Sequence, residues 1–166
     1  PILTDFEKWR TLSVPITLSY FGDTGLFGSD GVGFIFSARN SDSSGGLEPW
    51  KLTFSGTTPS VSRIANVRSG DDSSDPQDFT LYNGRVYFSA ETDDFGRELY
   101  STDGNSVILS MDVLRGTGSG NPFDLTVVGS TLYFIGVTDI VGGNRQVEIV
   151  AFTGTQSTIS VNAPGS

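Results

Sequence analysis

The chain lacks two residue types entirely, since its 166 residues include no histidine and no cysteine. Their absence excludes Ser-His-Asp and Cys-His nucleophilic sites, zinc sites built from Cys and His, haem held by His or Cys, and iron–sulfur clusters. Lysine is scarce as well: only Lys8 and Lys51 occur, and neither follows the glycines of a phosphate-binding loop. Carboxylates, hydroxyls and loop carbonyls are left as the candidates for chemistry.

Positive charge is also in short supply. The formal net charge is −9, from 19 acidic and 10 basic residues. An acidic surface repels nucleic acid and anionic membranes, so we expect neither as a partner. No apolar run approaches the length of a membrane-spanning helix, so we expect no membrane insertion. The chain begins at Pro1, which is not an initiator residue, and we therefore expect a processed form or a part of a longer protein.

What the chain does contain is a repeat with a period of about 46–52 residues. Its clearest strand recurs as GFIFSA from Gly33, VYFSA from Val86 and LYFIG from Leu132. We place the repeats at about 31–83, 84–129 and 130–166. Each holds short apolar alternations separated by glycine-containing turns, and four short strands per repeat are typical of a propeller blade. The sequence therefore predicts an all-β repeat fold of about three four-stranded units.

The first thirty residues, 1–30, differ from the repeats, and we interpret them as an N-terminal cap segment. Thr4-Asp5-Phe6-Glu7 matches a capping box and predicts a short helix over about residues 5–12. Ile16-Thr17-Leu18-Ser19-Tyr20 alternates as a strand does. Because the terminal units of a repeat array need covering, we expect this segment to close one end of the array.

One stretch points to a known family. Residues 98–105 read ELYSTDGN, which resembles the ELWxxDGT (hyalin-like) repeat of large secreted and surface-attached bacterial proteins. Tyr100 stands in the place of the tryptophan, and Asn105 in that of the final threonine. The resemblance implies a β-propeller-like fold and a secreted or cell-surface location in bacteria. It implies no common catalytic activity.

The other two repeats match this motif less well. The first keeps Glu48 and Trp50 but loses the Asp-Gly turn, and the third keeps Glu148 and Thr153-Gly154. The resemblance thus covers roughly residues 31–166, strongly in one repeat and weakly in two.

The number of repeats leaves two folds open. Propellers close with about four to eight blades, so three units would leave exposed strand edges. A homodimer could close a ring from two copies, or the chain could be part of a larger assembly. A β-trefoil is the alternative, because it also consists of three four-stranded repeats in a chain of this size.

The recurring glutamates are the best candidates for carboxylate chemistry. Glu48, Glu98 and Glu148 occupy equivalent positions in the three repeats. Glycoside hydrolysis needs two carboxyl groups about 5–9 Å apart. A glutamate that recurs in every unit is equally explained by a structural role, in which it binds backbone donors of its own blade. A carboxylate-dependent glycan-active enzyme therefore remains an alternative to a noncatalytic module.

Calcium is the one cofactor that the sequence suggests. Asp42, Asp93 and Asp94 lie in glycine-containing loops between the first two strands of their repeats, and carboxylates with loop carbonyls are the ligands that calcium prefers. None of these loops has the Asp-x-Asp-x-Asp-Gly spacing of an EF-hand. These three residues are the metal-ligand candidates, and solvated turns are the alternative.

Aromatic side chains are the last candidates. Trp50 lies in a degenerate repeat and is the candidate for stacking on a ligand such as a sugar ring, whereas the other repeat aromatics alternate with core phenylalanines. We therefore predict a noncatalytic extracellular binding or structural module that presents blade loops to a protein or a glycan. A β-trefoil lectin is a further alternative.

Overall fold

A computed structural model of the chain describes residues 16–20, 33–40, 45–56 and 58–154. The described part contains no helix, and hence no apolar helix that could cross a membrane. All of its regular structure is β, as predicted. The helix expected at about residues 5–12 lies outside the described residues.

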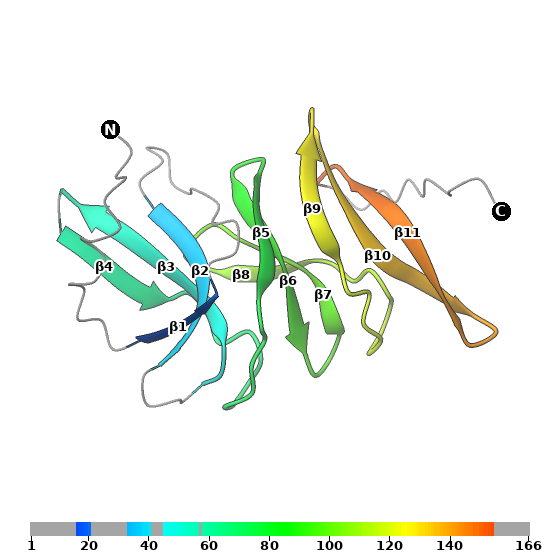
Figure 1. Ribbon diagram of the computed structural model, residues 1–166, viewed down its shortest axis with the longest axis horizontal. Coiled ribbons are helices and arrows are strands. Elements are labelled where there is room, and N and C mark those ends of the chain that lie inside the picture. Colours follow the sequence, from blue (N-terminus) through cyan, green and yellow to red (C-terminus); the bar gives the residue numbers. More distant parts are fainter. Residues whose placement is uncertain (1–15, 21–32, 41–44, 57, 155–166) are drawn as a thin grey trace.

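In the described part of the chain, eleven strands form three antiparallel sheets, in each of which consecutive strands are neighbours (Figure 1). The first sheet consists of β1 (Ile16–Tyr20), β2 (Gly33–Asn40), β3 (Glu48–Ser55) and β4 (Thr58–Arg63). The second consists of β5 (Gln77–Tyr82), β6 (Arg85–Thr92), β7 (Gly96–Thr102) and β8 (Val107–Met111). The third consists of β9 (Phe123–Val128), β10 (Thr131–Val141) and β11 (Asn144–Phe152).

The sheets begin one strand earlier than the sequence repeats. A periodic pattern fixes the length of a unit but leaves open where each unit starts. Strand β5, which ends the first sequence repeat, pairs with β6 and so belongs to the second sheet. The expected strand at Ile16–Tyr20 is present, and it pairs with β2 of the first sheet.

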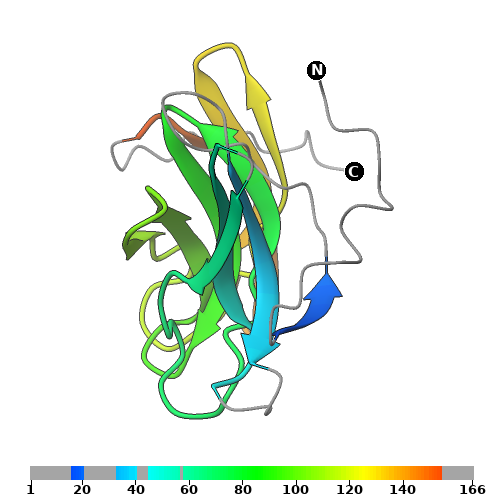
Figure 2. The same cartoon turned by 90° about the vertical axis from the view of Figure 1, so that its left-hand side faces the viewer.

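The second sheet is buried on both faces because it lies between the other two. Seen from the side of the first sheet, the three sheets lie one behind another (Figure 2). Phe88 and Tyr100 point towards the first sheet, where they pack in one cluster with Ile35. The alternate residues Tyr87 and Leu99 point the other way. Strand β6 is therefore nearly continuously apolar, as a strand covered on both sides must be.

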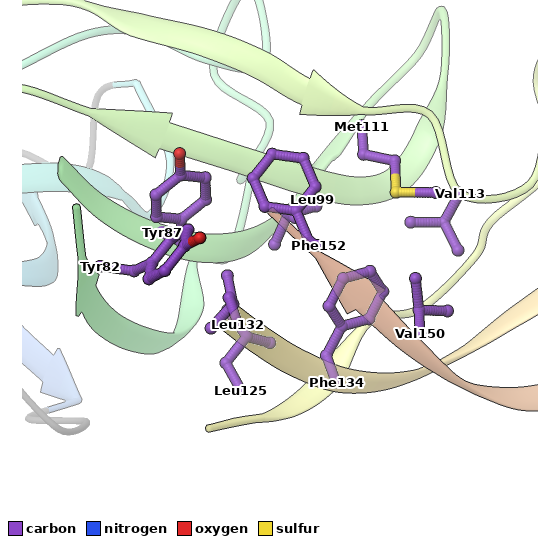
Figure 3. Close-up of a cluster of buried hydrophobic side chains, with 10 residues drawn as sticks. All are labelled: Tyr82, Tyr87, Leu99, Met111, Val113, Leu125, Leu132, Phe134, Val150 and Phe152. Atoms are coloured by element: carbon purple, nitrogen blue, oxygen red, sulfur yellow. The ribbon is translucent and has the colours of Figure 1, made fainter. Parts of the chain in front are cut away.

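The third sheet covers the second through a ten-residue core (Figure 3). The residues that the third sheet contributes to this core are Leu125, Leu132, Phe134, Val150 and Phe152. The rings of Tyr87 and Phe152 meet edge to face, with their centroids 5.4 Å apart. This apolar contact between sheets is the main source of cohesion along the row, because burial of large side chains is the dominant favourable term in folding.

Hydrogen bonds also join the second and third sheets, from β5 to β9 and to the turn that follows β9. The hydroxyl of Tyr82 donates to the Ser130 carbonyl at 2.8 Å, and the Thr80 hydroxyl donates to the Leu125 carbonyl at 3.1 Å. The sheets follow one another in an open row, and the described residues close neither a ring nor a barrel.

Candidate functional site

The three repeat glutamates stand at the same register position in their sheets. Glu48 pairs with Ala38, Glu98 with Ala90, and Glu148 with Gly136. In each pair the facing residue is alanine or glycine, which leaves room for the glutamate side chain. The repeat identified from sequence is thus reproduced as a structural position.

Glu48 holds the connection that leads from the first sheet to the second. Its carboxylate accepts hydrogen bonds from the backbone N–H of Val67 at 2.7 Å and of Ser74 at 3.1 Å. The Ser74 hydroxyl donates a third at 2.8 Å. Glu48 is 0% exposed, so these three donors replace the water that its carboxylate would otherwise bind.

Glu98 holds the next connection in the same way. The backbone N–H groups of Val113 and Gly120 each donate to its carboxylate at 2.6 Å, one to each oxygen. Glu98 is also 0% exposed. A Cβ atom at position 120 would lie 2.8 Å from one of these carboxylate oxygens and 2.5 Å from the Val113 side chain. Glycine at this position is what allows the connection to approach the carboxylate so closely.

Burial raises the pKa of both carboxyl groups. The pKa of Glu98 rises from 4.5 to about 7 because desolvation outweighs the backbone hydrogen bonds from Gly120 and Val113, which lower it. The pKa of Glu48 is also raised by burial, against the opposing effect of its bonds with Ser74 and Val67. A carboxyl with a pKa near neutrality can serve as a general acid, but a group with no exposed surface cannot reach a polysaccharide.

Glu148 differs from the other two. Its side chain is half-buried, and the Thr138 hydroxyl donates to its carboxylate at 2.8 Å. Thr138 belongs to strand β10 of the same sheet. The contact therefore stays inside one sheet, whereas Glu48 and Glu98 each bind a connection that leads to the next sheet.

These contacts refine the predicted structural role of the glutamates. We expected each carboxylate to bind backbone donors within its own blade. The donors for Glu48 and Glu98 are backbone N–H groups of the same sequence repeats, together with the Ser74 hydroxyl, and they lie in the connections between sheets. We call Glu48 and Glu98 the latches, because each fixes how one sheet follows another. Sequence reasoning missed these donors because a backbone N–H carries no residue signature.

The latched connections expose their middle parts along one edge of the sheets, with the turn between β6 and β7 (Figure 1). We call this surface the connection edge and define it by the exposed residues 69–72, 93–95 and 115–117. Arg68 ties the first connection to the turn, because its guanidinium lies 2.8 Å from the Asp93 carboxylate and 3.1 Å from that of Glu91. Arg97, just after the turn, receives a 3.0 Å bond at its carbonyl from Asn121 N–H.

Two of the three calcium candidates, Asp93 and Asp94, lie side by side in the turn between β6 and β7. Asp93 is engaged by Arg68, and Asp94 is exposed in the same turn. Asp42 lies outside the described residues. Among those residues, no three Asp or Glu side chains are grouped so that they could hold a metal ion. Calcium binding therefore stays a prediction from sequence.

Trp50 lies in the core of the first sheet. It is 7% exposed and packs in a cluster with Phe36, Ala38 and Leu52. Its indole nitrogen is buried, with no hydrogen-bond partner among the described residues. The face of the ring is therefore occupied by protein rather than open to a sugar. Tyr87 and Tyr100 are buried between sheets, as expected for repeat aromatics.

Comparisons with known proteins leave the family unassigned. A scan against protein-family models finds no match to this chain. Searches of the curated proteins and of the solved structures find no significant match either. The resemblance to the ELWxxDGT repeat therefore rests on the residues 98–105 and their weaker counterparts.

Proposed function

We propose that this chain is a noncatalytic binding or structural module of β-propeller-like architecture, which presents its connection edge to a protein or a glycan. The proposal rests on the burial and the hydrogen bonding of Glu48 and Glu98. Both are fully buried, and their oxygens are used by donors of the connections. The two carboxylates that were candidates for catalysis from the sequence thus serve to position loops.

The propeller-like architecture is supported by the order and packing of the sheets. Consecutive antiparallel strands form each sheet, and consecutive sheets pack face to face. Propeller blades have the same two properties. The resemblance to the ELWxxDGT repeat points to the same architecture and to a secreted or surface-attached protein of bacteria.

In the mechanism that we propose, Glu48 and Glu98 hold the two connections in fixed conformations, so that the connections are already ordered when a partner binds. A loop that must order itself on binding loses affinity, because ordering costs conformational entropy. The two latches fix both ends of each connection before a partner arrives. The exposed middles, residues 69–72 and 115–117, then display carboxylates, hydroxyls and one guanidinium at fixed positions. Such polar groups suit the hydroxyls of a glycan or the polar rim of a protein surface.

The proposal is tested by screening the purified chain against a glycan array and a panel of purified extracellular proteins. We expect binding that weakens at least tenfold when Asp72 at the connection edge is changed to Lys. Asp139→Lys is the matched control, because Asp139 is also an exposed aspartate but lies in the third sheet. Equal losses in both variants would show that net charge, rather than the connection edge, determines binding.

The enzymatic alternative rests on the pKa of about 7 at Glu98, and the full burial of this carboxyl group stands against it. It calls for a direct test with polysaccharide substrates. Hydrolysis by the wild-type chain that disappears in a folded Glu98→Gln variant would overturn the noncatalytic proposal. A β-trefoil lectin, the other alternative, predicts saturable sugar binding by a chain that remains monomeric.

A further inference from the structure

The third sheet has an apolar face that is largely exposed in the described part of the chain, although Val137, which pairs with Val147 on this face, is buried. Phe123 of β9, Ile135 of β10 and Ile149 of β11 are paired in register across the three strands. Paired residues point to the same side of a sheet, and so does Val147, two residues before Ile149. Their neighbours Phe134 and Val150 point to the other side, into the core shared with the second sheet. We call these four residues the outer face.

The outer face is strongly exposed. Val147 is 60% exposed, Ile149 46% and Phe123 44%, and Ile135 is half-buried. Seven of the ten exposed large hydrophobic residues among those described belong to the third sheet, three of them on the outer face, and exposed apolar side chains gathered on one face mark an interaction surface. The members are Phe123, Val127, Val128, Ile140, Val141, Val147 and Ile149.

The second sheet shows what the same face does elsewhere in the molecule. The residues that correspond to the outer face by register are Gln77, Ser89, Leu99 and Arg97. That face is already an interface, since Leu99 packs in the core shared with the third sheet.

The exposed face is thus more apolar than the covered one. Phe123 stands where the second sheet has glutamine, Ile135 where it has serine, and Val147 where it has arginine. A surface destined for water would show the opposite difference. The outer face therefore has the composition of an interface.

We propose that the outer face binds the outer face of a second copy of this chain, in a dimer with two-fold symmetry. A second copy fits because the face presents no carboxylate: the four residues are uncharged, and Arg145, which alternation places on the same side of β11, is a cation. Each chain has a net charge of −9, so two copies repel each other wherever carboxylates meet. Glu148 lies on the same strand but points to the opposite side with its partner Gly136. An isologous contact then matches apolar side chains with apolar side chains and brings no carboxylates together.

The first test is the solution mass by light scattering over a range of protein concentrations. We expect a mass near twice 17.7 kDa for the wild type. Ile149→Lys should give the single-chain mass, because it places a charge at the centre of the contact. Ile108→Lys should leave the dimer intact, since Ile108 is a 51% exposed isoleucine of the second sheet. A wild type that stays monomeric, or an Ile149→Lys variant that stays dimeric, would overturn the proposal.

Disulfide trapping distinguishes this dimer from a head-to-tail ring. The chain has no cysteine, so a single introduced cysteine can pair only with its counterpart in another copy. We expect Val147→Cys or Ile149→Cys to form a covalent dimer under mild oxidation, and Ile108→Cys to form none. A non-covalent dimer in which neither outer-face cysteine links would contradict the two-fold contact. None of these results depends on ligand binding at the connection edge, so the two proposals fail separately.

Discussion

The second and third sheets are both built from consecutive antiparallel strands, and both carry a glutamate at the same register position. They differ in how many of their faces are covered by neighbouring sheets. The second sheet is covered on both faces, and Glu98 is sealed by a connection. The third sheet is covered by protein on the face towards the second sheet, and Glu148 is bound by a hydroxyl of its own sheet. Glu98 and Glu148 occupy equivalent positions, but they differ in burial and in hydrogen-bond partners because their sheets have different neighbours. The comparison separates what one unit specifies by itself from what its neighbours add.

The largest expected difference lies between the two faces of the third sheet. Phe134 is 1% exposed in the shared core, so Phe134→Ala should lower the free energy of unfolding by about 3–5 kcal/mol. Ile149→Ala on the outer face should cost less than about 1 kcal/mol in dilute protein. Urea denaturation at low and high protein concentration measures both. A large cost for Ile149→Ala in dilute, monomeric protein would mean that the outer face is already packed within one chain.

The next difference concerns the glutamates. Glu98→Ala leaves the buried N–H groups of Val113 and Gly120 without their acceptor, at about 1–3 kcal/mol for each group. Glu148→Ala removes one bond from a side-chain hydroxyl at a half-buried site, and we expect about 0.5–1 kcal/mol. Urea midpoints of the two variants test this order. Similar losses at both positions would show that Glu148 also serves as a latch.

The raised pKa of Glu98 makes stability depend on pH. Its folded pKa of about 7 lies above the ordinary value of 4.5, so the folded state binds a proton more tightly than the unfolded state. The resulting stabilisation is complete below about pH 4.5 and is lost as pH rises through about 7. The total is on the order of 3 kcal/mol.

A Glu98→Gln variant provides the control, because the amide does not titrate. Stability of this variant should change less between pH 5 and about 8 than that of the wild type. A wild-type stability that rises over this interval would mean that the backbone hydrogen bonds favour the anion more than burial opposes it.

Much of the local structure was predictable from sequence. The alternation in Val86-Tyr87-Phe88 and in Ile16–Tyr20 indicated strands, and the period identified Glu98 and its two counterparts as equivalent. These signals are local, because alternation reflects the two sides of a strand and a repeat reflects one unit. The all-β class follows from them.

The contacts between units were not predictable in the same way. The donors to Glu98 are backbone N–H groups 15 and 22 residues away, and every residue except proline carries such a group. The need for glycine at position 120 arises only from its contact with Glu98 and Val113, which no pattern along the chain shows. Alternation also says which side Ile149 points to, but not whether another sheet covers that side. The placement of Trp50 in the core shows the same limit, since its position in the repeat was known and its surroundings were not.

The smallest change in stability that we predict concerns the turn that follows β7, the strand that contains Glu98. In the second sheet Asp103 accepts bonds from the backbone N–H of Asn105 and of Ser106, both at 2.9 Å, and these lower its pKa from 3.8 to about 2. Because its folded pKa is depressed, its stabilisation is present above about pH 4 and is lost as pH falls towards 2.

The side chain of Asp103 is 44% exposed, so solvent screening keeps this contribution small. Asp103→Ala should cost less than about 1 kcal/mol at neutral pH, and Asp103→Asn still less, because its amide oxygen can accept the same two bonds. Urea denaturation at pH 7 and at pH 3 measures the two variants against the wild type. A cost for Asp103→Ala as large as that for Glu98→Ala would mean that the turn, and not the latch, controls the path of the chain from one sheet to the next.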